Sequence, residues 1–210
     1  MKRLAAALLV LLSLSACGAQ SVWAPDEAVR KAAYRHPGPS TITVYTVVNN
    51  GSGSGAHSGI MISGSQRVLF DPAGTFQVNV VPERNDVHYG INERIREFYE
   101  LFHARESFHV IAQEVEVSPE VAELAIQRVE AYGAVSKAMC TIAATEVLQG
   151  LPGFDHVRRK WTPNTLTEDI AMMDGVVTRK IYEYDDDDKT IVLAEFQEAM
   201  ARSIAAKSAE

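Results

Sequence analysis

The chain has 210 residues, of which 47% are hydrophobic and 22% charged, and its formal net charge is -7. This composition excludes a disordered tail, a collagen-like fibre and a multi-pass membrane protein. The acidic balance also argues against a nucleic-acid partner, which would require a concentrated basic surface. The length predicts a single domain that is large enough to bury a core.

The first 16 residues have the features of an export signal. Lys2 and Arg3 precede an apolar run over residues 4–12, and small residues follow. That run is too short to span the ~30 Å hydrocarbon core of a bilayer, which requires about 20 residues. An ordinary secretory signal, cleaved near Ala16 or Ala19, is the alternative interpretation.

The segment Leu14-Ser15-Ala16-Cys17 resembles the lipobox of bacterial lipoproteins. The resemblance implies that Cys17 is diacylated and becomes the mature N-terminus. Two or three acyl chains anchor a protein stably to a membrane. Because Gly18 and not Asp follows the cysteine, the resemblance implies an outer-membrane protein that faces the periplasm. We therefore expect a lipoprotein of the bacterial cell envelope.

We expect three regions along the chain. Residues 1–16 form the lipoprotein signal peptide, residues 17–40 form a lipidated N-terminus and tether, and residues 41–210 form one domain. The tether contains Gly, Ser and three prolines, with a short helix near residues 26–34.

Hydrophobic periodicity and turn residues predict the elements of the domain. Runs rich in β-branched and apolar residues predict strands over residues 41–48, 57–62, 67–71 and 108–117. Apolar residues at intervals of three and four predict a helix over residues 91–105. Ser118 and Pro119 begin another helix, which ends near Gly133. Further helices are expected over residues 138–149 and 190–206.

Three side chains form a candidate catalytic group. His57 opens a predicted strand, and Cys140 lies at the start of an apolar helix. A helix N-terminus stabilises a thiolate, and a neighbouring imidazole can accept the thiol proton. Asp71 ends the strand predicted to pair with the His57 strand, and period-2 alternation allows it to face His57 and hold the imidazole.

Each of these residues also has a structural interpretation. His57 follows a glycine-rich loop and is compatible with a solvated histidine, whereas Cys140 in an Ala-rich helix is compatible with a core position. If Cys17 carries lipid, Cys140 is the remaining thiol and is either a buried small hydrophobe or a reactive group. Asp71 precedes Pro72, and aspartate is common in turns.

The order of the three residues resembles the circularly permuted papain-like hydrolases, which include permuted NlpC/P60 peptidases and lecithin–retinol acyltransferase-like enzymes. The resemblance covers residues 41–150, with His-Ser-Gly-Ile around His57 and Met-Cys-Thr around Cys140. It implies that Cys140 is the nucleophile, His57 the base and Asp71 the orienting residue. Two features depart from the group: Met139 stands where asparagine is often found, and residues 82–130 form a long insert.

Oxyanion stabilisation would involve the backbone N–H of Cys140. Tyr45 on the first predicted strand is a candidate side-chain donor, with a core tyrosine as the alternative. The remaining histidines show no metal-ligand spacing, so we expect neither a metal site nor a cofactor.

These observations predict an α+β fold with a permuted papain-like core, in which a small antiparallel sheet packs against the nucleophile helix and additional helices. The predicted function is an envelope-anchored thiol hydrolase that attacks an amide, with peptidoglycan peptide as the expected substrate. Two alternatives stay open. One is a lipid acyl hydrolase or acyltransferase on the same fold, and the other is a non-catalytic binding lipoprotein of the envelope.

Overall fold

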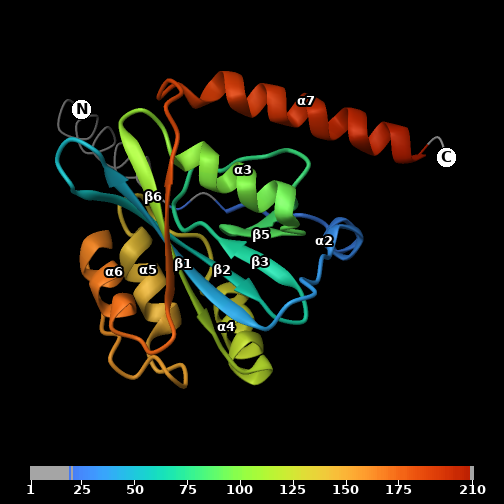
Figure 1. The fold of residues 1–210 in the computed structure, drawn as a ribbon. Helices are drawn as coiled ribbons and strands as arrows, with labels where there is room; N and C mark the ends of the chain where they lie inside the picture. Colours follow the sequence, from blue (N-terminus) through green and yellow to red (C-terminus); the bar gives the residue numbers. More distant parts are fainter. Residues whose placement is uncertain (1–18, 20, 209–210) are drawn as a thin grey trace, which may run out of the picture.

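The computed structural model describes residue 19 and residues 21–208, and its centre is one antiparallel sheet with helices on both faces (Figure 1). The strands follow the order β4-β5-β3-β2-β1-β6-β7 across the sheet. The expected α+β class is confirmed. The strands are β1 (Thr41–Asn49), β2 (Gly55–Ser63), β3 (Arg67–Phe70), β4 (Glu83–Arg84), β5 (Val87–Tyr89), β6 (Phe108–Glu116) and β7 (Val177–Tyr182). The helices are α2 (Asp26–Ala32), α3 (Glu93–His103), α4 (Pro119–Tyr132), α5 (Cys140–Leu148), α6 (Pro163–Ala171) and α7 (Lys189–Ser208).

Strand β1 lies at the centre of the sheet and is buried on both faces, between β2 and β6. Its alternate residues contribute to two separate hydrophobic clusters because neighbouring side chains on a strand point to opposite faces. Ile42 and Val44 pack into one cluster with α4, α5 and α6. Tyr45 and Val47 pack into the other cluster with α3 and α7. Figure 1 shows these two groups of helices on opposite sides of the sheet. We call the two sides the α5 face and the α3 face.

Most of the predicted elements are present within a few residues of the expected bounds. The amphipathic helix that begins near residue 91 is α3, with the Asn92 side chain capping its N-terminus. The helix that begins at Pro119 is α4, and Ser118 caps it as its sequence indicates. Strong local signals, namely cap residues and clear periodicity, therefore position these elements correctly.

Four elements are absent from the predicted set: β4, β5, α6 and β7. β4 and β5 have two and three residues and are joined by Asn85 and Asp86, which both have positive φ angles. This is the turn conformation that matches the twist of a hairpin. β7 pairs with β6 at the sheet edge, and most of its residues are exposed, so it has no apolar alternation to detect.

The described part of the expected tether is packed against the domain and is not a free linker. Trp23 forms a β-bridge with Arg84, and the Arg84 side chain donates to the backbone carbonyl of Ala24 and pairs with Asp26. The Arg67 backbone N–H donates to Tyr34 O at 2.7 Å. Residues 21–40 therefore extend the domain along the β3–β5 side of the sheet.

The signal peptide and the lipidated Cys17 expected from the sequence lie outside the described residues. Within the described part of the chain, no helix combines the length and the apolar character that crossing a bilayer would demand.

Candidate active site

His57 lies near the start of β2, next to an irregularity in the sheet. It pairs with Val47 of β1, whereas Gly55 pairs with Val48, so Ala56 is an extra residue in the ladder. Such a bulge bends a strand and re-aims the neighbouring side chain, and bulges are common beside active sites. The His57 side chain points to the α3 face, where it lines a cavity together with Val47.

Asp71 follows β3 directly and holds the His57 imidazole. His57 Nε2 lies 2.7 Å from Asp71 Oδ1, and the Asp71 side chain is buried. An ionised carboxylate can only accept hydrogen bonds, so Nε2 carries the proton and donates it to Asp71. The remaining ring nitrogen, Nδ1, is then free to act as a base. The arrangement expected for these two residues from strand alternation is present.

Two further donors fix the Asp71 carboxylate. The Tyr99 hydroxyl of α3 donates to Oδ1 at 2.8 Å, and the Phe76 backbone N–H donates to Oδ2 at 3.4 Å. The carboxylate also lies directly against the backbone at Gly74, where an added Cβ would overlap it. A Cβ at Gly59 would similarly meet the Tyr99 hydroxyl. Both glycines therefore leave room for this hydrogen-bonded group.

Cys140 is the first residue of α5, as the sequence indicates. The helix is tied to β2 by the buried hydroxyls of Ser58 and Thr141, whose oxygens lie 3.1 Å apart. Two residues earlier, Ala138 has a φ of 65°, the left-handed conformation that costs a non-glycine residue about 1–2 kcal/mol. Strained backbone of this kind is concentrated at functional sites.

The Cys140 thiol and the His57 imidazole interact closely enough to change each other's pKa. Burial alone raises the pKa of the thiol, but the His57 hydrogen bond and charge, with the Ser58 backbone N–H, lower it to about 7. The sulfur also lies 3.9 Å from Thr141 Oγ1. Hydrogen bonds between nucleophile and base often tighten only when substrate binds.

Asp71 and Cys140 together favour the imidazolium form of His57. Burial opposes the charged form, yet the Asp71 charge and hydrogen bond, followed by Cys140, raise the pKa of His57 to about 10. Burial likewise opposes ionisation of Asp71, but His57 holds the pKa of that carboxyl well below its usual range. Both shifts favour a thiolate–imidazolium pair near neutral pH, which is the reactive form of a cysteine nucleophile.

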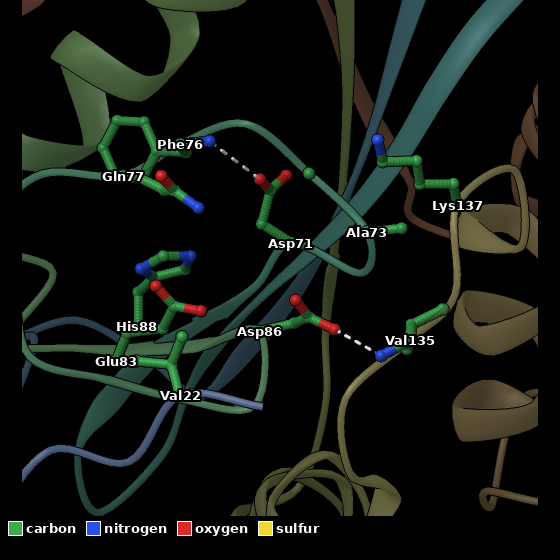
Figure 2. A pocket seen from close by; sticks show the side chains of 11 residues that line it. Val22, Asp71, Ala73, Phe76, Gln77, Glu83, Asp86, His88, Val135 and Lys137 are labelled. Atoms are coloured by element: carbon green, nitrogen blue, oxygen red, sulfur yellow. Dashed lines mark hydrogen bonds between the residues drawn. The ribbon is translucent and has the colours of Figure 1, made fainter. Parts of the chain in front are cut away.

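Asp71 also lines a cavity of about 210 Å³ (Figure 2). Glu83, Asp86, His88 and Lys137 are among the residues that line it. Asp86 Oδ2 accepts the backbone N–H of Val135 at 2.7 Å, marked by a dashed line in Figure 2. This bond ties the β4–β5 turn to the loop that leads into Cys140.

His103 of α3 completes the surroundings of His57. The two rings lie nearly parallel, with centroids 5.6 Å apart, and His103 Nδ1 lies 3.0 Å from the Tyr99 carbonyl. Burial lowers the pKa of His103 to about 3, so its ring is neutral. One ligand atom each from His57, Asp71 and His103 lie within 4.8 Å of one another, which is compatible with a bound metal ion. The 2.7 Å separation of His57 and Asp71 is that of a direct hydrogen bond.

Tyr45 is not placed to stabilise an oxyanion. Its ring is buried in the cluster on the α3 face, and its hydroxyl donates to Glu100 at 3.1 Å. Arg96 and Arg179 hold the Glu100 carboxylate, at 2.8 Å each. The hydroxyl proton is therefore committed to a structural ion network, which corrects the expected role. The backbone N–H of Cys140 stays the candidate oxyanion donor.

Sequence reasoning missed Tyr99 and His103 as members of the site. Both lie on the buried side of α3, within a run of aromatic residues that is typical of a core helix. The only available signal is their polarity, since buried tyrosine and histidine require hydrogen-bond partners.

In comparisons with known proteins, no protein-family model, curated protein or solved structure matches this chain.

Proposed function

We propose that the protein is a cysteine hydrolase with Cys140 as nucleophile, His57 as acid and base, and Asp71 as the residue that orients His57. The observation that carries this proposal is the hydrogen bond between His57 and the buried Asp71 carboxylate, beside a cysteine at a helix start. Nucleophile, base and orienting group are the three roles that covalent acyl transfer requires.

The proposed reaction has two steps. The Cys140 thiolate attacks a carbonyl carbon, and the imidazolium of His57 gives its proton to the departing nitrogen or oxygen as that bond breaks. Water then attacks the thioester, with neutral His57 accepting the water proton and returning it to the cysteine sulfur. Asp71 keeps the imidazole in one tautomer and stabilises its charge throughout. No other reactant is needed.

A permuted papain-like core is the fold that best suits this group. The His57 strand precedes the Cys140 helix in the chain, and α5 packs on the sheet directly against β2. The order supports the resemblance noted in the sequence. The seven-stranded sheet, with its added α6, β7 and α7, is more extensive than the small sheet expected.

Peptidoglycan peptide is the proposed substrate, because the expected signal sequence would direct the chain to the envelope and the resemblance includes cell-wall peptidases. Lipid acyl hydrolysis or transfer is the alternative for the same nucleophile. The test is incubation of isolated sacculi with the full chain and with Cys140→Ser. Soluble muropeptides released only by the unsubstituted protein would support the peptidase proposal. Intact sacculi with Cys140-dependent cleavage of phospholipid esters would support the alternative.

A non-catalytic binding lipoprotein would retain the fold without an activated thiol. Cys140 would then react as an ordinary cysteine, with a pKa near ~8.5. The reactivity of this one thiol therefore separates the catalytic proposal from the binding proposal before any substrate is known.

A further inference from the structure

A second cavity, of about 260 Å³, opens on the α3 face beside His57. It shares the Ala73–Gly74 turn with the acidic cavity of Figure 2, since that turn lines both cavities. Val47 and Phe108 supply apolar walls, and Thr75 and His103 supply polar ones. Pockets for whole drug-sized ligands measure about 300–1,000 Å³, so this cavity suits one substituent of a substrate.

Lys189 supplies the charge in this cavity. It is the first residue of α7, which begins beside α3, and its Nζ lies 4.6 Å from the centroid of the Phe102 ring. Of the described residues that line the cavity, none carries a carboxylate. His103 is neutral, so the ammonium group is the cavity's main fixed charge apart from His57 itself.

The acidic groups nearest to Lys189 are engaged elsewhere. Asp71 accepts from His57 and Tyr99, and Asp187 accepts the backbone N–H of Ser107 at 3.1 Å. Asp185 pairs with Arg105 at 3.5 Å. No described carboxylate forms an ion pair with Lys189, and its burial lowers the pKa of the ammonium group. Asp71 and Asp187 therefore act on the ammonium group by charge but not by direct contact, and a half-buried cation with no direct partner favours an incoming anion.

We propose that this cavity is a subsite for a carboxylate on the leaving group of the substrate, with Lys189 as the residue that binds it. The proposal rests on the proposed function. The cavity is lined by His57, the residue that protonates the departing nitrogen, and not by Cys140. A substituent in the cavity therefore belongs to the amine side of the scissile amide. The preferred substrate is then an acylated amino acid or a peptide whose departing part ends in a carboxylate close to the cleaved bond.

Two small alkylating probes test the subsite without a known substrate. Bromoacetylglycine carries a carboxylate, and bromoacetylglycinamide replaces it with a neutral amide of similar size. Both place their terminal group on the amine side of an amide, two bonds beyond the nitrogen, when Cys140 displaces bromide. The rate of modification of Cys140 in the full chain is measured by mass spectrometry of its peptide, and the ratio of the two rates is the readout.

The unsubstituted protein should prefer the carboxylate probe. Lys189→Met keeps the apolar stem over Phe102 and should reduce that ratio by about tenfold, the effect of one charge-assisted hydrogen bond. Lys189→Arg should retain most of the preference. The matched control is Lys180→Met, which removes an exposed lysine of β7 and should leave the ratio unchanged. Equal ratios in the unsubstituted protein and in Lys189→Met would overturn the subsite.

The neutral probe separates failure of the subsite from failure of the proposed function. If the rate of the neutral probe depends on His57 but the ratio of the two rates is the same in Lys189→Met, the His57–Cys140 pair is supported and the subsite is wrong. If the neutral probe reacts as with an ordinary thiol, and independently of His57, both proposals fall. A thermal melt of each variant identifies any loss of rate that comes from unfolding.

Discussion

The side chains of His57 and Asp71 meet across neighbouring strands, with Nε2 and Oδ1 2.7 Å apart. The β2–β3 pairing sets Ile60 opposite Phe70 and, one residue further, Gly59 opposite Asp71. His57 and Gly59 point to the same face, so Asp71 lies diagonally across from His57. Because Gly59 has no side chain, the carboxylate reaches the imidazole over it.

The first prediction concerns the pH dependence of this pair. The pKa of His57 is raised to about 10, so its stabilising contribution is full below ~6.5, the value for an unfolded histidine, and is lost as pH rises through about 10. The pKa of Asp71 is lowered, so its contribution is full above ~3.9 and is lost on acidification. Asp71→Asn should therefore lower the free energy of unfolding most between about pH 4 and 6.5.

The expected cost in that window is about 3–5 kcal/mol of unfolding free energy, the range for a buried ion pair that loses one partner. Urea denaturation of both proteins at pH 5.5 and pH 9.5 measures the difference and its decrease with pH. The exposed Asp174 provides the control, since Asp174→Asn should change stability little at either pH. A cost for Asp71→Asn that is equal at both pH values would contradict the ion pair.

Tyr99 should contribute to stability through its bond to Asp71. Tyr99→Phe removes the donor and keeps the ring, so it should destabilise the protein by about 1.5–3 kcal/mol, as expected for a hydrogen bond to a charged group. Tyr132→Phe is the matched control, because the Tyr132 hydroxyl donates to Glu146 at the surface. Chemical denaturation should show the larger loss in Tyr99→Phe. Equal losses in the two variants would mean that the hydrogen bond to Asp71 stabilises the protein no more than a surface hydrogen bond does.

Ala138 should store strain immediately before the nucleophile. Its φ of 65° is readily accessible to glycine, so Ala138→Gly should stabilise the folded protein by about 1 kcal/mol. Ala201→Gly, in the exposed interior of α7, should instead destabilise it by a similar amount. The two substitutions should change stability in opposite directions because, of these two residues, only Ala138 has a positive φ angle, and denaturation midpoints measure both effects; destabilisation by both substitutions would contradict the strain at Ala138.

Chelation should leave the reactivity of Cys140 unchanged. His57, Asp71 and His103 have the spacing of a metal-ligand group, but a proton between His57 and Asp71 satisfies both atoms in the proposed site. Alkylation of Cys140 is therefore expected at the same rate with and without EDTA. A large change on EDTA treatment, reversed by added Zn²⁺, would indicate a metal centre in place of the triad.

The sequence predicts where the members of the proposed catalytic group lie, because each is on an element with a strong local signal. The β-branched and apolar runs of β1, β2 and β3 predict the positions of His57 and Asp71, and the apolar run that follows residue 138 predicts that of Cys140. The strand period then predicts that His57 and Asp71 share a face. The long insert has clear helix signals, but they do not give the position of α3 against the sheet, which depends on tertiary packing.

Because the sequence does not give the position of α3, it assigns Tyr45 to the site and misses Tyr99. Tyr45 and Tyr99 both lie on the α3 face with rings 5.2 Å apart, yet one hydroxyl binds Glu100 and the other binds Asp71. Only the position of α3 decides which tyrosine meets the site. Lys189 is similarly brought to His57 by the packing of α7 beside α3, about 130 residues along the chain from that strand.

The measurement that tests the account most directly is the rate of Cys140 alkylation by iodoacetamide against pH, in the full chain and in His57→Ala. The account predicts a midpoint near the thiol pKa of about 7 in the unsubstituted protein. In His57→Ala the midpoint should move to ~8.5 or above, because burial then acts on the thiol without a compensating imidazolium. His109→Ala, which removes an imidazole on the α6 side of the sheet, opposite the face to which His57 points, should change nothing. An identical midpoint with and without His57, or labelling of Cys140 only after unfolding, would contradict the catalytic pair.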